Sequence, residues 1–387
     1  MTDHVTDSLV LATLKDLISI ESVNPQFGGS GEAAVADYIE QFFSAYHPVV
    51  ERQEVFPARE NLICFFPGRN PGKTLLFEAH MDTVSIPSDA RSTTVPAVEG
   101  SRLYGRGACD TKGSLAAMIC AIKAILDETG ELPVNVYFIG AVDEEYRAKG
   151  VYDLIKKPIK ADGAVIGEPT SLDVVIAHKG VYRFHLVTKG KSVQSSKPHQ
   201  GINAIYKMID VIQIIRGRLQ DSYKGKGHPL TGDPTVSVGI IQGGKEVNTV
   251  PNLCSIDVDR RVVPGETRCD VEKEFNDIIM LLKEQDPQFD AVIENPFFDP
   301  PLNTSEHSRI VQTMKGICKE VIGKERVVGV PYGSDASKIA TIGIPSIVFG
   351  PGDISNAHSA QEYVEIEELM QAQQIYRTLI EQFDCGH

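Results

Sequence analysis

Residues 134–145 read VNVYFIGAVDEE, a nearly continuous apolar run that leads directly into Asp143, Glu144 and Glu145. An apolar run of this length indicates a strand buried on both faces, as in parallel or mixed sheets. Three adjacent acids at the end of such a strand repel one another unless a cation lies among them. The alternative is that the three acids lie in a solvated loop. The stretch therefore predicts a buried sheet, with a candidate cation site at the edge where the acids follow the strand.

Helices and strands alternate on both sides of this stretch. Through residues 1–178 the pattern indicates an α/β domain. Its helices are expected at 5–20, 31–45 and 113–126, and its other strands at 62–66, 74–79 and 163–167. The alternation resumes near residue 297, with a helix at 305–321, a strand at 344–349 and a final helix at 366–383.

A different pattern fills the middle of the chain. Strands are expected at 181–188, 235–241, 254–263 and 289–293, and helices at 203–219 and 269–285. This order, β-α-β-β-α-β, is typical of a small open sheet with helices on one face. The sequence therefore predicts an α+β, ferredoxin-like domain at 179–296, inserted into a larger discontinuous domain made of residues 1–178 and 297–387.

Bulk composition limits the possible functions. The chain has 387 residues, 42% of them hydrophobic, and a formal net charge of −14. Nucleic acid is not an expected partner, because its binding needs a clustered basic surface and the sequence has none. A membrane is not expected either, since no window approaches the ~20 apolar residues that cross a bilayer. The N-terminus lacks the pattern of a secretion signal, and the seven cysteines are scattered without a CxxC pair, which together favour the cytoplasm.

Four further segments place metal-type ligands at strand ends or in loops. EAHMDT contains His80 and Asp82, whose i, i+2 spacing lets the aspartate hydrogen-bond one imidazole nitrogen and leaves the other for a cation. Asp110 occurs in LYGRGACDTKGS, Glu168 in GAVIGEPTS and His358 in ISNAHSAQEYV. Taken singly, each of these three has an ordinary explanation, as a helix N-cap, a surface acid and a loop histidine.

Taken together, these residues indicate one site. Each candidate lies at the C-terminal end of an expected strand or in the loop beyond it, which is where open α/β sheets bind ligands. Histidine, aspartate and glutamate without thiolate suit a hydrolytic zinc that keeps an open position for water.

In this order, the segments resemble the acetylornithine deacetylase and succinyl-diaminopimelate desuccinylase family of di-zinc hydrolases, which also holds aminoacylases, carboxypeptidases and dipeptidases. The likeness runs from about residue 20 to residue 364 and rests on five ordered motifs. It implies a zinc-exopeptidase-like mixed sheet with helices on both faces, and an inserted lid and dimerisation domain. It also implies two Zn²⁺ ions, for which Co²⁺ can substitute, and a homodimer.

The resemblance also implies a role for each ligand-type residue. His80 and Glu168 would hold one zinc ion, and Glu145 and His358 the other. Asp110 would bridge both ions. The two cations would share a water molecule and lower its pKa, so that hydroxide forms near neutral pH.

Other residues of the motifs would orient or act on the reacting groups. Asp82 would orient His80. Glu144 matches the family's general base, which takes the water proton and delivers it to the leaving amine. YGSDAS is similar to another segment of the family, so Ser334 and Asp335 are expected to shape the site.

The inserted domain carries three expected substrate contacts. Asn248 in GKEVNTVPN and Arg261 in DVDRRVVPGE match motifs that bind substrate in the family, and a guanidinium suits a substrate carboxylate. The alternative for Arg261 is a surface ion pair with Asp259 or Glu266. Gln194, in KSVQSSKPHQGINAI, stands where family members carry a histidine that stabilises the oxyanion. Loss of an oxyanion donor typically costs about 10²–10³ in rate, and a neutral replacement donor should cost less.

The combined interpretation is a hydrolase that cleaves the amide bond of a small N-acyl amino acid. Deacetylation of an N-acetylornithine-like substrate, a step of arginine biosynthesis, is the first choice, because GEPTSLDVVIAHKG resembles the acetylornithine deacetylase branch more than the peptidases, which often have aspartate at position 168. The resemblance implies that glutamate there favours deacylation or carboxypeptidase action. Succinyl-diaminopimelate desuccinylation and dipeptide or carboxypeptidase cleavage are the alternatives. From another class, a catalytically impaired, metal-containing binding protein has Gln194 as its only support.

Overall fold

The chain forms two compact units. The computed structural model describes residues 8–383 except 89 and 92, so the first expected helix, at 5–20, lies partly outside the described residues. Unit 1 consists of Met1–Ile176, Thr304–Val328 and Ser334–His387, and unit 2 of Ala177–Asn303 and Gly329–Gly333. The domain boundaries expected after residues 178 and 296 remain a prediction.

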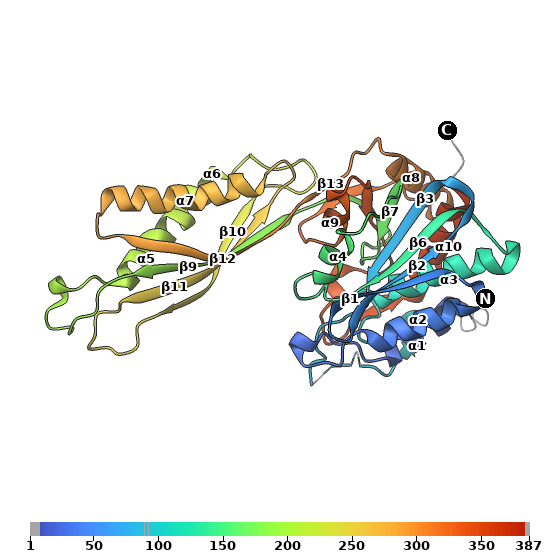
Figure 1. Ribbon diagram of the computed structural model, residues 1–387, viewed down its shortest axis with the longest axis horizontal. Coiled ribbons are helices and arrows are strands. Elements are labelled where there is room, and N and C mark those ends of the chain that lie inside the picture. Colours follow the sequence, from blue (N-terminus) through green and yellow to red (C-terminus); the bar gives the residue numbers. More distant parts are fainter. Residues whose placement is uncertain (1–7, 89, 92, 384–387) are drawn as a thin grey trace. The chain divides into compact units, whose positions relative to one another are not determined.

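A mixed sheet lies at the centre of unit 1 (Figure 1). Its parallel strands are β6 (Leu132–Ala141), β3 (Gly68–His80), β7 (Gly163–Ile166) and β15 (Ser346–Val348). Antiparallel strands extend it, namely β1 (Val49–Phe56), β2 (Arg59–Phe66) and β8 (Val174–His178). The last two residues of β8, Ala177 and His178, are counted in unit 2, and there they pair with β13 (Leu302–Asn303). The order is β1-β2-β6-β3-β7-β15-β8-β13, and β14 (Val327–Val330) pairs with β8. The expected mixed sheet is confirmed.

Helices cover both faces of this sheet. One face packs against α1 (Leu9–Ser19), α2 (Ala33–Phe43), α3 (Lys112–Thr129), α8 (Arg309–Ile322) and α10 (Ile366–Gln382), which share one core with the strands. The other face contacts α4 (Lys149–Leu154) and α9 (Ala336–Thr341). The VNVYFIGA run is the body of β6, and it is buried because helices lie on both sides of the sheet.

Short elements complete unit 1. A small antiparallel sheet has the order β16-β5-β4, built from Tyr363–Glu365, Arg102–Tyr104 and Ala97–Glu99. Single 3₁₀ turns lie at Pro25–Phe27, Ser44–Tyr46 and Ile354–Asn356. Among the described residues, no helix combines the length and apolar character of a membrane span. The cytoplasmic location stays a prediction.

Unit 2 is a four-stranded antiparallel sheet with helices on one face (Figure 1). The sheet order is β10-β11-β9-β12, from Thr235–Gly243, Leu253–Val262, Gly180–Lys189 and Asp290–Asp299. The helices are α5 (Ala204–Ile214), continued by a π-helical turn at Ile215–Leu219 and α6 (Gln220–Ser222), and α7 (Arg268–Gln285); a 3₁₀ turn lies at Pro198–Gln200. The chain order β-α-β-β-α-β is the expected one, and the α+β class is confirmed.

Strand alternation sorts the side chains of unit 2 between the two faces of its sheet. Tyr182, Phe184 and Leu186 of β9 are buried in one cluster with Phe275 of α7. The alternate residues of β9, such as Arg183, lie on the open face. This is the period-2 pattern that identified 181–188 as a half-exposed strand.

Four strands of the large sheet were not expected, namely β1, β8, β13 and β14. β1 reads VVERQEVF, and its residues are exposed or half-buried along its whole length. A strand at the edge of a sheet buries too little surface to need an apolar run. The hydrophobic pattern of its sequence is therefore a weak indication of a strand. The helix expected over 203–219 is also interrupted, because it changes from α to π geometry at Ile215.

Phe43 provides a test of the core. It is fully buried at the end of α2, with its ring centroid 4.9 Å from that of Phe66 and 5.7 Å from that of Phe138. We expect Phe43→Ala to lower the free energy of unfolding by about 3–5 kcal/mol, because it removes buried surface and leaves a cavity. Phe42→Ala is the control, since Phe42 is only partly buried. Urea unfolding followed by circular dichroism measures both, and equal losses would contradict this packing.

Candidate metal centre

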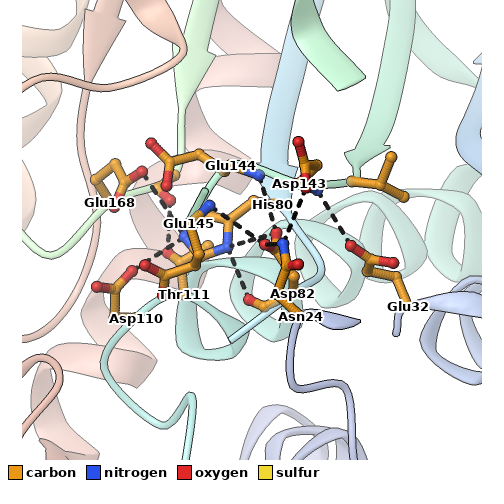
Figure 2. A network of polar contacts seen from close by, with 12 residues as sticks. Asn24, Glu32, His80, Asp82, Asp110, Thr111, Asp143, Glu144, Glu145 and Glu168 are labelled. Atoms are coloured by element: carbon orange, nitrogen blue, oxygen red, sulfur yellow. Dashed lines mark hydrogen bonds and ion pairs between the residues drawn. The ribbon is translucent and has the colours of Figure 1, made fainter. Parts of the chain in front are cut away.

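The expected ligands meet at one edge of the large sheet. His80 is the last residue of β3, Glu144 and Glu145 follow β6, and Glu168 follows β7. These three strands are parallel and adjacent, so their carboxyl ends lie side by side. Figure 2 shows the side chains gathered there, with Asp110 from the turn before α3.

Asp110 is central to the group. Its Oδ1 lies 3.0 Å from His80 Nε2, and its Oδ2 lies 3.2 Å from His358 Nε2. His80 Nε2 is also 3.9 Å from Glu168 Oε1, and His358 Nε2 is 3.0 Å from Glu145 Oε2. The structure therefore brings all five expected ligands together, and the two oxygens of one aspartate face two different imidazoles.

The ligand-type atoms are close enough to share metal ions. In His80, Asp110 and Glu145, one ligand atom from each residue lies within 4.8 Å of the others, and the same holds for His80, Glu144 and Glu168. Glu144, expected as a base, thus also lies within 4.8 Å of the histidine, as the expected ligands do. Distance alone does not separate these two roles.

The electrostatics of the site fit bound cations. Burial, together with the charge of Asp110, raises the pKa of Glu145 to about 8 and that of Glu168 well above its usual value. Burial also raises the pKa of Glu144. For Asp110 burial acts in the same direction, but hydrogen bonds from His358 and His80 outweigh it and hold its pKa low. Glu145 Oε1 has no hydrogen-bond partner among the described residues. Buried carboxylates and imidazoles without thiolate form a donor set that suits two divalent ions.

The link between His80 and Asp82 differs from the expected one. His80 Nδ1 lies 2.9 Å from the backbone carbonyl of Asp82, whereas the carboxylate Oδ1 is 3.6 Å away, too far for a good hydrogen bond. The carboxylate instead accepts the backbone N–H groups of Glu144, at 3.1 Å, and Glu145, at 3.2 Å. Asp82 therefore fixes the imidazole through its carbonyl group and the next two acids through its carboxylate.

A buried polar network continues from Asp82 away from the ligands (Figure 2). The side-chain amide of Asn24 donates to Asp82 Oδ2 at 2.8 Å and to Asp143 Oδ1 at 3.1 Å. Asp143 has a positive φ of 69°, a conformation that few non-glycine residues adopt. The first of the three acids thus turns the chain and contacts the network, so that only the next two reach the ligand group.

An ion pair lies behind this turn. Arg59 forms a bidentate pair with Glu32, with Nε–Oε2 at 2.8 Å and Nη2–Oε1 at 2.5 Å, and its Nη2 is 3.3 Å from Asp143 Oδ1. Glu32 Oε1 also accepts the backbone N–H of Asp143 at 3.1 Å. All three side chains are buried, so the guanidinium balances carboxylate charge that would otherwise be costly.

The other expected site residues divide between the units. Ser334 and Asp335 are buried in unit 1, at the start of α9. Asn248, Arg261 and Gln194 belong to unit 2. Arg261 Nε is 2.8 Å from Asp259 Oδ1, so the ion pair considered as its alternative is present, although Glu266 pairs with Arg260 instead.

Two of these residues lie in exposed segments of unit 2. The carbonyl oxygen of Asn248 accepts the backbone N–H of Ser195 at 2.9 Å. Gln194 Oε1 accepts the hydroxyl of Ser196 at 2.9 Å. Both side chains are exposed, so neither is committed to the core of the unit.

The residues that support the ligand group were not expected from the sequence. Asn24, Glu32 and Arg59 lie far from the recognised motifs, and their residue types give no chemical signal without the contacts. Arg106 and Glu362 lie inside quoted segments, and both are buried polar residues. A charged residue inside a ligand-bearing motif was the available signal for these two.

The chain is similar to known proteins of one hydrolase family. Residues 76–382 match the family model described as Peptidase family M20/M25/M40. The chain is 30% identical to an acetylornithine deacetylase of Myxococcus xanthus over 97% of each chain, and 32% identical to an acetylornithine deacetylase of Salmonella arizonae over 81% of each. It is 29% identical to a probable carboxypeptidase of Aspergillus clavatus, covering 98% of this chain and 90% of that one.

Solved structures share the fold. Aminopeptidase PepT of Bacillus cereus aligns with a TM-score of 0.79 at 21% identity, covering 97% of this chain and 98% of that chain. The M20 family metallo-carboxypeptidase Sso-CP2 of Sulfolobus solfataricus aligns with a TM-score of 0.76 at 21% identity, covering 97% and 99%. At this identity the likeness establishes the architecture alone.

The amide of Asn24 is expected to matter for stability, because it lies between two buried carboxylates. Asn24→Ala should lower the free energy of unfolding by about 1–3 kcal/mol, the cost of leaving buried polar groups without a partner. Gln26→Ala is the control, since Gln26 is exposed and its backbone N–H alone bonds to Asn24. Chemical denaturation of both variants measures the difference. Equal stabilities would show that the network does not depend on this amide.

Proposed function

We propose a specific reaction for this chain, which belongs to peptidase family M20/M25/M40 and is therefore a metal-dependent hydrolase of amide bonds. The proposed reaction removes the acyl group of a small N-acyl amino acid, most simply an N-acetylornithine-like one. The observation that carries the proposal is the position of Asp110, with His80 at one carboxylate oxygen and His358 at the other.

These contacts support the proposed ligand assignment. His80 and Glu168 would hold one ion, Glu145 and His358 would hold the other, and Asp110 would serve both. Two Zn²⁺ ions, replaceable by Co²⁺, suit these donors. Such ions, when bound, polarise the amide carbonyl and make the attacking water more acidic.

Glu144 is proposed as the general base. It follows β6 in the same turn as Glu145, and its backbone N–H is held by Asp82 at 3.1 Å. Burial raises the pKa of Glu144, which brings its proton affinity nearer to what a base needs around neutral pH. Its carboxylate would take the proton of the attacking water and pass it to the leaving amine.

The choice of substrate rests on the relatives. Two of the proteins aligned above are acetylornithine deacetylases, at 30% and 32% identity. Glu168 is compatible with deacylation and with carboxypeptidase action, so the choice between these two rests on the relatives. The probable carboxypeptidase at 29% identity favours a second candidate, cleavage of a dipeptide or a C-terminal residue.

Paired substitutions of adjacent acids test these roles. Glu144→Gln should lower kcat on N-acetylornithine by about 10²–10⁴-fold while the protein still binds two ions. Glu145→Gln should instead lose affinity for one ion. Metal content by plasma emission spectrometry and turnover on acetylated amino acids, succinyl-diaminopimelate and dipeptides measure both effects. If the Glu144→Gln variant bound one ion fewer, Glu144 would be a metal ligand rather than the base. If the metal-loaded wild-type chain cleaved none of these substrates, the binding-protein alternative would be favoured.

We also propose that the chain forms a homodimer through unit 2. β10 lies at one edge of its sheet and carries Ile240 and Ile241, both about half exposed. Tyr206 of α5 is also exposed, at 66%. An edge strand with free backbone groups and exposed apolar side chains suits pairing with the same strand of a second copy. In such a dimer, Gln194 would serve as a neutral hydrogen-bond donor to the oxyanion, with Asn248 and Arg261 contacting substrate.

The dimer is tested by placing a charge on this edge. Ile241→Lys should convert the protein to monomers, because a second copy would have to bury the ammonium group. Met280→Lys is the control, since Met280 is 56% exposed on α7 rather than on the edge strand. Size-exclusion chromatography with light scattering gives the mass of each. A monomeric wild-type chain, or dimers of equal stability in both variants, would refute the proposed interface.

A further inference from the structure

Glu362 is a buried carboxylate outside the ligand group. It directly precedes β16 and lies four residues after His358, and its side chain is fully buried. Its Oε1 accepts two consecutive backbone N–H groups, from Cys109 and Asp110, each at 3.0 Å. The carboxylate therefore holds the backbone of the central aspartate.

Arg106 extends this contact to a second segment. One terminal nitrogen of its guanidinium pairs with Glu362 Oε2, and the other, Nη2, donates to the carbonyl oxygen of Ser359 at 3.2 Å. Arg106 is 2% exposed, so the pair lies out of water. Ser359 is the residue after His358, which means that one ion pair connects the turn of Asp110 to the loop of the histidine.

The side chain of this histidine is less enclosed than those of the other ligand-type residues. Its side chain is 54% exposed, unlike Asp110 and Glu145, which are 8% and 5% exposed. His358 also has a positive φ of 58° and lies in a loop. Its position relative to Asp110 therefore depends on what holds the loop.

We propose that Glu362 and Arg106 are a positioning pair that fixes Asp110 and His358 relative to each other, and thereby sets the affinity for the ion held by His358 and Glu145. The inference rests on the proposed two-ion site. Groups that orient ligands without touching the metal typically change its affinity by 10–100-fold when they are replaced. The ion held by His80 and Glu168 should be affected less, because His80 is held by β3 and Asp82.

A nearby ion pair offers a matched control. Arg102 Nε and Glu365 Oε1 lie 2.7 Å apart and join β5 to β16, and both side chains are partly exposed. Among the described residues, neither side chain contacts the turn of Asp110 or the loop of His358. Glu365→Gln should therefore leave the affinity for both ions unchanged. If Glu362 served only to join the two strands, the two substitutions would act alike.

The experiment is a calorimetric titration of Zn²⁺ into the full chain after removal of metal by a chelator. Wild type should bind two ions, and Glu362→Gln should bind one of them at least about 10-fold more weakly, because glutamine turns an amide N–H towards Arg106. Arg106→Lys, which keeps the charge but not the two-pronged contact, should weaken the same ion. In a His358→Ala background, Glu362→Gln should have a smaller effect on ion affinity than in the wild-type chain, because only the contribution through Asp110 remains.

Other outcomes would overturn the inference. Two ions bound by Glu362→Gln as tightly as by wild type, or equal weakening of both ions, would show that the pair only supports the fold. A loss of affinity as large in the His358→Ala background as in the wild-type chain would show that the pair does not act by placing the two ligands relative to each other. Failure of the wild-type chain to bind two ions would instead refute the proposed function, and the inference with it.

Discussion

The contact of Asp110 with two imidazoles, His80 at 3.0 Å and His358 at 3.2 Å, joins the carboxyl edge of the large sheet to a loop near the C-terminus. Glu145 and Glu168 are buried beside it, and charge of one sign is costly in a medium of low polarity. The raised pKa values of these two glutamates express that cost. The arrangement is favourable only if positive charge is present among the carboxylates. All the backbone segments that carry a ligand must therefore be held in place at the same time.

Two carboxylates outside the ligand group hold such backbone segments in place, and both do so in the same way. Asp82 accepts the N–H groups of Glu144 and Glu145, and Glu362 accepts those of Cys109 and Asp110. A carboxylate bound to two successive N–H groups fixes the direction of the peptide between them, and hence of the side chains that follow. Each is backed by an arginine, reached through Asn24 and Asp143 in the first case and directly in the second.

The mixed sheet, the inserted α+β order and the convergence of the ligands were predictable, because buried parallel strands are apolar runs and their carboxyl ends share one edge. β1, β8, β13 and β14 were not. β1 is an edge strand without that signature, and the other three contain at most five residues each. The contact from Asp82 to the imidazole was expected through the carboxylate and occurs through the carbonyl, because residue spacing specifies the side of a strand but not which oxygen is nearer. Asn24, Glu32 and Arg59 act only through contacts between distant segments, which no local pattern encodes.

β11 carries two successive arginines, and strand alternation sends them to opposite faces of its sheet. Arg260 is fully buried, with Nη2 2.6 Å from Glu266 and 2.9 Å from Glu274. Arg261 is about one-third exposed on the other face, with one contact to Asp259. An exposed ion pair contributes at most about 1 kcal/mol, so an incoming carboxylate could displace Asp259 at small cost. Removing a partner of Arg260 would leave an uncompensated buried charge. Of the two guanidinium groups, Arg261 is therefore suited to exchange partners with a ligand, and Arg260 to hold α7 against the sheet.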